Sequence, residues 1–339
     1  MSDNKANASI DLTKFIASIL IFSMHANALG DFSHASVVLE LSARWGVPFF
    51  FICSAYFLFR KNSNGVIDKK VMLNYSVRVC SLYFLWLIYN LPSVFFIRLY
   101  SKDLHSIGTW LYFIKNSILS STFTGSWYIV SCIFSAWMIY LLSKKFKTGV
   151  TIAITFIPFL LCAFTSVYDG IIPDSMHKVL TFLCFPLNIF NGCFYFALGK
   201  KLADNSDLIV KKFSSKLIML LIIAFYGIYI IEVLICRRKG ILSSTDVGFS
   251  LPILAYLLMV LCLRTNFTIK KSVLLRKLST IIFCCQGNVL FVKPFCIRFL
   301  RINSSIIIYI IMIMIMIIIC LIVLFLQKHT NWKWINYMT

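Results

Sequence analysis

Long apolar segments without strand-like alternation dominate the chain. Ten are long enough to cross a bilayer, which takes about 20 mostly apolar residues in a helix. They are residues 12–30, 38–59, 79–98, 127–143, 149–167, 180–199, 217–236, 249–264, 278–297 and 306–326. Lipid offers no hydrogen-bond partner to an open strand edge. The pattern therefore predicts an all-α, polytopic membrane helical bundle with about ten transmembrane helices, forming a single domain over residues 1–339. The amphipathic segment 104–124 is expected at the membrane interface.

Composition supports a membrane protein and argues against nucleic-acid binding. The chain is 60% hydrophobic and 13% charged, whereas a soluble domain has roughly 25% charged residues. Its net charge of +21 would suit nucleic-acid binding, but no soluble segment is left to present a basic surface. About two thirds of the Lys and Arg residues fall in connections on one side of the predicted membrane, which places the N- and C-termini in the cytoplasm. Only Arg237-Arg238-Lys239 clearly opposes this orientation. The cysteines lack metal-site spacing, so no metal is predicted.

Two ionisable residues stand out in the first apolar segment. Lys14 and His25 are 11 residues apart, which returns a helix to nearly the same face about 16 Å further along its axis. A histidine within the membrane is costly, and its default interpretation is functional. The alternative is a structural histidine bonded to a neighbouring helix. Lys14 alone is typical of a lysine that extends from a helix end to the membrane surface.

These residues carry a resemblance to a known family. The segment DLTKFIASILIFSMH resembles the opening helix of the membrane acyltransferase-3 family, whose motif is a basic residue, ten residues and a histidine; here these are Lys14 and His25. Arginine is the commoner basic residue. The segment ARWGVPFFFICSAYFLFRK is similar to the family's next helix, with Ala55 in place of a glycine; it carries Arg44, Val47, Pro48, Phe49, Phe50, Ser54 and Tyr56. RVCSLYFLW and GSWYIVSC fit later helices, so the resemblance is densest over residues 10–140.

The resemblance implies specific roles. His25 is the candidate base that takes the proton of an acceptor hydroxyl. Lys14, Arg60 and Arg78 are candidate anchors for the phosphates of the acyl donor; Arg60 has the alternative of an ordinary cytoplasmic anchor. Arg44 either orients the donor carbonyl or forms an ion pair with Glu40.

Further residues of the family segments and the later helices are candidate supporting residues; they are Ser54, Tyr56, Trp127, Tyr128 and Glu232. Ser54 either donates to the developing oxyanion or bonds its own helix backbone. Glu232 either accepts a proton, orients His25, or pairs with Arg237 or Arg238.

The expected function is therefore a membrane O-acyltransferase of the bacterial inner membrane. It would move an acetyl or other short acyl group from cytoplasmic acyl-CoA to a hydroxyl of a cell-surface or lipid-linked polysaccharide, such as O-antigen or capsule. Its expected partners are acyl-CoA as donor substrate, the glycan acceptor and membrane lipids, without nucleic acid. The alternatives are a non-enzymatic glycan flippase or exporter, a glycan polymerase, and an N-acyltransferase for small molecules. Carriers of this kind often show internal repeats, and polymerases a long outer loop; the sequence has neither.

Overall fold

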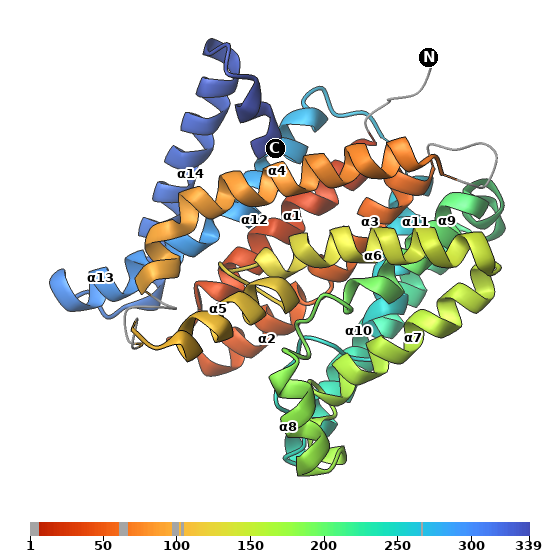
Figure 1. Ribbon diagram of the computed structural model, residues 1–339, viewed down its shortest axis with the longest axis horizontal. Coiled ribbons are helices and arrows are strands. Elements are labelled where there is room, and N and C mark those ends of the chain that lie inside the picture. The colour runs from red at the N-terminus through yellow and green to blue at the C-terminus, as the bar shows by residue number, and fades with distance from the viewer. Residues whose placement is uncertain (1–6, 61–66, 97–101, 103–104, 266) are drawn as a thin grey trace.

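The computed structural model describes residues 7–60, 67–96, 102, 105–265 and 267–339, and within them it contains helices and no strand (Figure 1). Its α-helices are α1 (Ala8–His25), α2 (Ser33–Ala43), α3 (Gly46–Phe59), α4 (Lys69–Val94), α5 (Ile107–Leu119), α6 (Ser126–Lys145), α7 (Thr148–Phe164), α8 (Asp174–Phe182), α9 (Gly192–Lys212), α10 (Ser215–Arg238), α11 (Leu251–Arg264), α12 (Ser272–Leu290), α13 (Val292–Phe299) and α14 (Ser305–His329). Two short 3-10 helices are η2 (Asp169–Ile171) and η3 (Lys333–Met338). Three basic residues used for the predicted orientation, Lys5, Lys61 and Arg98, lie outside the described residues.

Helices able to cross a membrane make up most of the fold. Within the described ranges, 7 spans are long and apolar enough, with α2–α3 and α12–α13 each counted as one, and α7 and α11 are shorter apolar helices. The all-α membrane prediction is thus confirmed, while the count of about ten and the cytoplasmic termini stay predictions. The expected helix 180–199 is wrong, because α8 ends at Phe182 and α9 begins only at Gly192.

The predicted helix 38–59 is interrupted within the bundle. It is divided into α2 and α3, with Arg44 and Trp45 at the junction. Pro48 lies in the first turn of α3, where a missing backbone N–H removes no helical hydrogen bond. The break therefore precedes the proline, and it places Arg44 at the junction of the two helices.

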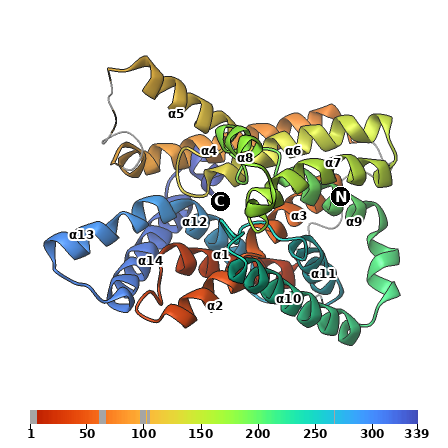
Figure 2. The same ribbon diagram turned by 90° about the horizontal axis from the view of Figure 1, so that it is seen from below.

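Helices α1 and α3 occupy the centre of the molecule. Figure 2 shows them between α4 and α6 on one side and α10 and α11 on the other. α1 packs most extensively against α12, and α3 against α9. At the second contact a Cβ added to Gly199 would lie 2.6 Å from the Cβ of Ala55. The family that the sequence resembles has a glycine at the position of Ala55. Here Gly199 on the facing helix leaves the space instead, so the two helices still approach closely.

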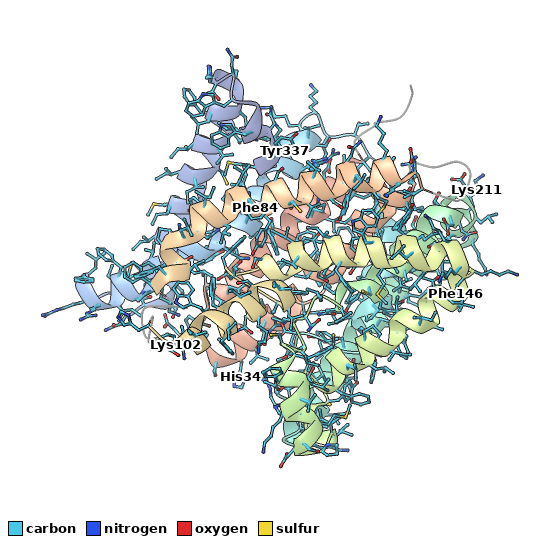
Figure 3. The ribbon with its side chains drawn as sticks, in the orientation of Figure 1. His34, Phe84, Lys102, Phe146, Lys211 and Tyr337 are labelled. Atoms are coloured by element: carbon cyan, nitrogen blue, oxygen red, sulfur yellow. The ribbon has the colours of Figure 1, made fainter. Side chains whose placement is uncertain are left out.

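Two segments lie outside this central packing. None of the α5 residues is buried, and the helix projects from the bundle in Figure 2; its interfacial position stays a prediction. η3 folds back against α4, where the Trp86 indole donates to the carbonyl of Met338 at 3.1 Å. Figure 3 shows Tyr337 of η3 and His34 of α2 toward opposite ends of the bundle, so α1 leads from the η3 end to the α2 end.

Candidate functional site

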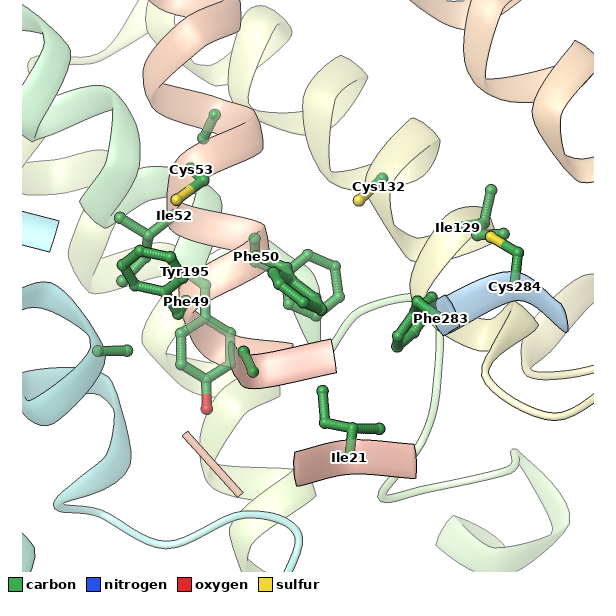
Figure 4. Close-up of a cluster of buried hydrophobic side chains, with 14 of the residues drawn as sticks. Ile21, Phe49, Phe50, Ile52, Cys53, Ile129, Cys132, Tyr195, Phe283 and Cys284 are labelled. Atoms are coloured by element: carbon green, nitrogen blue, oxygen red, sulfur yellow. The ribbon is translucent and has the colours of Figure 1, made fainter. Parts of the chain in front are cut away.

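A cavity of about 180 Å³ lies beside the first turns of α1. It is enclosed by α1, α3, α4, α6, α12 and the segment around η3, and its lining includes Lys14, Phe50, Ser54, Tyr75, Arg78, Tyr128, Ile129, Cys132, Ser279, Phe283, Cys284, Tyr337 and Thr339. Figure 4 shows Phe50 from α3 and Phe283 from α12 directed toward the same space, with Cys132 and Ile129 on α6. The cavity therefore brings together four residues expected at the site: Lys14, Ser54, Arg78 and Tyr128.

Lys14 supplies an unpaired positive charge to this cavity. The helix that carries it begins at Ala8, where the Asn7 side chain caps the first turn by accepting from the Ile10 amide. The Lys14 ammonium lies 5.9 Å from the centre of the Phe50 ring. Among the described residues no carboxylate is within ion-pair distance of it, because Asp11, one turn earlier, is bound by Arg276 at 2.8 Å. A cation without a carboxylate partner is suited to hold a phosphate.

Hydroxyl groups and aromatic rings form the wall opposite Lys14. The hydroxyls of Ser54 and Tyr128 lie 3.0 Å apart, and the thiol of Cys132 is hydrogen-bonded by Tyr75 and Tyr128. The expected bond of Ser54 to its own helix backbone is therefore wrong: the hydroxyl reaches across to α6. The Tyr128 ring packs 5.4 Å from Phe283. The wall is polar at one point and apolar elsewhere, which is typical of small-molecule binding sites.

The other two expected donor anchors, Arg78 and Arg60, lie in different places. The exposed Arg78 lines the cavity and lies 3.4 Å from the carbonyl of Thr339. Arg60 instead stacks on the Tyr56 ring at 5.7 Å and lines a separate open groove with lysines of α6 and α9. Trp127 packs against Phe51 at 5.8 Å. The structure therefore brings Lys14 and Arg78 together and leaves Arg60, Tyr56 and Trp127 outside the cavity.

His25 lies at the other end of α1. It is the last residue of the helix, which ends because the chain turns into a left-handed conformation at Asn27 (φ 52). Its side chain is exposed, and among the described residues it makes no hydrogen bond. Among the described residues no bond joins His25 to a neighbouring helix, so the alternative of a structural histidine gains no support. The imidazole lies close enough to Arg44 and Asp246 for their charges to act on it.

Arg44 is the centre of an ion-pair network beside His25. It donates to Glu40 at 2.8 Å and to Thr245 at 2.8 Å, and it also pairs with Asp246. Thr245 in turn donates to Glu40 at 2.5 Å. The expected Glu40–Arg44 pair is confirmed, and the second carboxylate comes from a distant segment. Because two carboxylates hold the guanidinium, it fixes the junction of α2 and α3 against the loop before α11; its action on the donor carbonyl stays a prediction.

Glu232 serves the loop before α11. Its carboxylate accepts hydrogen bonds from the Tyr168 hydroxyl at 2.5 Å, the Phe249 amide at 2.6 Å and the Ser250 hydroxyl at 2.5 Å. Burial and the bond to Glu232 raise the pKa of Tyr168, so this hydroxyl remains a donor at neutral pH. The expected pairing with Arg237 or Arg238 is wrong, because other donors take the carboxylate. Nothing in these contacts brings Glu232 to His25.

Four residues at these sites escaped the sequence reasoning. Asp246 and Thr245 hold Arg44, Arg276 holds Asp11, and the buried Gln286 lies next to the cavity wall. The first three carry no local signal, since their partners are more than 200 residues away in the chain. Gln286 had one: it is a polar residue within the apolar segment 278–297, and such residues deserve a functional hypothesis.

Comparison with known proteins matches residues 7–325 to the acyltransferase-3 family, described as an acyltransferase domain. Among curated proteins, an amino-acid racemase from Enterococcus faecalis is 27% identical over 234 residues, which cover 62% of this chain and 30% of the racemase. The chain thus spans less than a third of that relative, and the activity in its name is not carried over. No solved structure matches.

Proposed function

The chain belongs to the acyltransferase-3 family, and on that premise we propose that it is an O-acyltransferase which moves an acetyl or other short acyl group from cytoplasmic acyl-CoA to a hydroxyl of a cell-surface or lipid-linked polysaccharide. We place it in the bacterial inner membrane, with O-antigen or capsule as the class of acceptor. The family supports acyl transfer by a multi-pass membrane protein; the donor and the acceptor are those that the family resemblance implies.

One observation carries the proposal: a single helix holds an unpaired cation at one end and a free imidazole at the other. Lys14 lines the cavity at the η3 end of α1, and His25 closes the helix about 16 Å further along its axis. Lys14 and Arg78 would hold the phosphates of the donor at the cavity. The acyl group would then be directed along α1 toward His25.

The transfer itself needs a base and a route for the electrons. His25 takes the proton of the acceptor hydroxyl as its oxygen attacks the thioester carbon. The C=O electrons move to oxygen in the tetrahedral intermediate and return as the C–S bond breaks. The thiolate that leaves receives the proton from the imidazolium, so the products are an ester and free CoA. Arg44 and Asp246 keep the surroundings of the imidazole fixed through the step.

The proposed position of the acceptor rests on the exposure of His25. The His25 side chain is exposed at the α2 end of the bundle, whereas the donor cavity adjoins the η3 end. Acceptor and donor would thus approach from opposite ends of α1. This arrangement suits a donor made in the cytoplasm and a glycan assembled outside it.

The test compares glycans from wild-type cells, a deletion strain and a His25→Ala strain by NMR for ester-linked acetyl groups. Acetyl groups present only in the wild type support the proposal. Identical glycans from the deletion and wild-type strains would remove it for that polysaccharide. A flippase or exporter, the second class considered, would instead change the amount of surface glycan without changing its acetylation.

A further inference from the structure

The side-chain amide of Gln286 on α12 is fully buried and has no partner. The residue is 0% exposed, and among the described residues neither its oxygen nor its nitrogen forms a hydrogen bond. Burial of an unsatisfied amide destabilises the fold, because its hydrogen bonds to water are lost and not replaced. Asn90 on α4, also 0% exposed, is the opposite case, since it donates to the carbonyls of Trp86 and Cys284. The unsatisfied amide of Gln286 therefore indicates a site for a ligand.

The amide lies at the start of α6, next to the cavity. A Cβ added to Gly125 would be 2.8 Å from the amide nitrogen of Gln286 and 3.2 Å from the Phe283 ring. Phe283 lines the cavity, as do Tyr128 and Ile129 from the first turn of α6. Gly125 precedes that helix in a left-handed conformation, with φ of 82°, which favours glycine. Gln286 and the amino end of α6 thus meet at the cavity wall, without a side chain at position 125 between them.

The register of α12 against α1 places Gln286 between the levels of Lys14 and His25. Arg276 bonds Asp11, and the Ser279 hydroxyl donates to the carbonyl of Lys14. Both pairs are separated by 265 residues, so the two helices run parallel. The same offset puts Gln286 level with Ile21, about 6 Å along the axis before His25.

We propose that the Gln286 amide and the amino end of α6 form the binding site for the carbonyl oxygen of the acyl thioester. A helix amino end carries partial positive charge, and the amide N–H is a donor already removed from water, so both would stabilise the negative charge that oxygen gains when the acceptor attacks. The inference rests on the proposed acyl transfer and adds its oxyanion site. No atom is transferred to Gln286: its N–H donates a hydrogen bond, the C–S bond breaks, and the proton passes through His25.

The first test is turnover in the purified full-length chain in lipid nanodiscs, with acetyl-CoA and glycan from the deletion strain. Gln286→Met keeps the side-chain volume and removes the amide. We expect turnover to fall about 10²- to 10³-fold, as for the loss of one oxyanion donor, with KM for acetyl-CoA nearly unchanged. The thermal midpoint should hold or rise, because a buried unsatisfied group is removed. Asn90→Leu, the matched control, should lower the midpoint and leave turnover of the folded protein near wild type.

The second test does not need turnover. It compares binding of two unreactive CoA analogues in which a methylene replaces sulfur, one with the acyl carbonyl and one without it. The wild type should prefer the carbonyl analogue, and Gln286→Met should lose that preference. Wild-type turnover in Gln286→Met, or no carbonyl preference in the wild type, would overturn the oxyanion site. A Gln286-dependent preference in a protein without turnover would support the site and remove the proposed reaction.

Discussion

Arg276 holds both carboxylate oxygens of Asp11, at 2.8 and 3.0 Å. Asp11 is the acid one helical turn from Lys14, so this bidentate pair determines whether the Lys14 charge is available to a ligand. It also joins α12 to α1 at the η3 end of the bundle. The same contact therefore shapes the cavity beside Lys14 and the charge within it.

Releasing Asp11 should weaken donor binding at a distance. In Arg276→Gln the freed carboxylate can turn to Lys14 and neutralise it, which we expect to raise KM for acetyl-CoA about tenfold, or ~1.4 kcal/mol. The measurement is steady-state kinetics at constant ionic strength. The double variant Arg276→Gln/Asp11→Asn should recover most of the loss, and a double variant as poor as the single one would contradict this explanation.

Lys14 itself should act as a charge anchor. Lys14→Met should raise KM for acetyl-CoA by about tenfold or more and flatten the dependence of KM on salt, because the screened charge is gone. Lys14→Arg should keep both near wild type, since the arginine retains the charge. An unchanged KM in Lys14→Met would place the donor phosphates elsewhere.

His25→Ala should abolish acylation without harming the protein. Loss of a general base typically costs 10²- to 10⁴-fold in rate. The side chain is exposed and makes no hydrogen bond among the described residues, so membrane abundance should stay normal on immunoblots. Glycan NMR with wild-type levels of ester-linked acetyl in the variant would contradict the role.

Arg44 should be needed for folding as much as for chemistry. Arg44→Ala leaves Glu40 and Asp246 without their cation; with these side chains 30% and 22% exposed, we expect a loss of about 1–3 kcal/mol, less than for a fully buried pair. Thermal unfolding in detergent measures it. Neutralising both acids in the same chain, with Glu40→Gln and Asp246→Asn, should restore much of the midpoint. If the midpoint of Arg44→Ala equals that of wild type, the network is not structural.

The contact of α3 with α9 should depend on its glycine. Gly199→Ala would place a Cβ 2.6 Å from the Ala55 side chain and 2.6 Å from the carbonyl of Ile52, and overpacking of this kind costs about 1–3 kcal/mol. The expected result is a lower thermal midpoint. Ala55→Gly in the same chain should relieve only part of the loss, because the carbonyl remains; full stability in Gly199→Ala would show that the helices separate readily.

Local patterns predicted the helices well where one face of the chain is continuously apolar. Most of the segment 12–30 lies in α1, which ends at His25, and 306–326 falls within α14. They failed at 180–199, where Pro186 and the polar Asn188 and Asn191 interrupt the apolar run and the backbone turns before α9. The Phe190 amide donates to the side-chain oxygen of Asn188, and this bond is one of the contacts that hold the turn.

The site was predictable where its chemistry lies on one helix. Lys14 and His25 follow from their spacing on α1, and the Glu40–Arg44 pair from its i, i+4 separation. Asp246 joins Arg44 across 202 residues, and Tyr128 joins Ser54 across 74. Such partners are chosen by the packing of whole helices, which no local pattern encodes.

The fixed register of α1 and α12 has a consequence for substrate choice. Lys14 and His25 share helix α1, which fixes their separation along the axis at about 16 Å, and the bonds of Asp11 and Lys14 to α12 hold that helix in register beside them. If Lys14 holds a donor phosphate, as proposed, the distance from phosphate to histidine is constant. Carriers would then be selected by the length of the arm between phosphate and thioester. A donor with a shorter arm would be held at Lys14 and still fall short of the histidine.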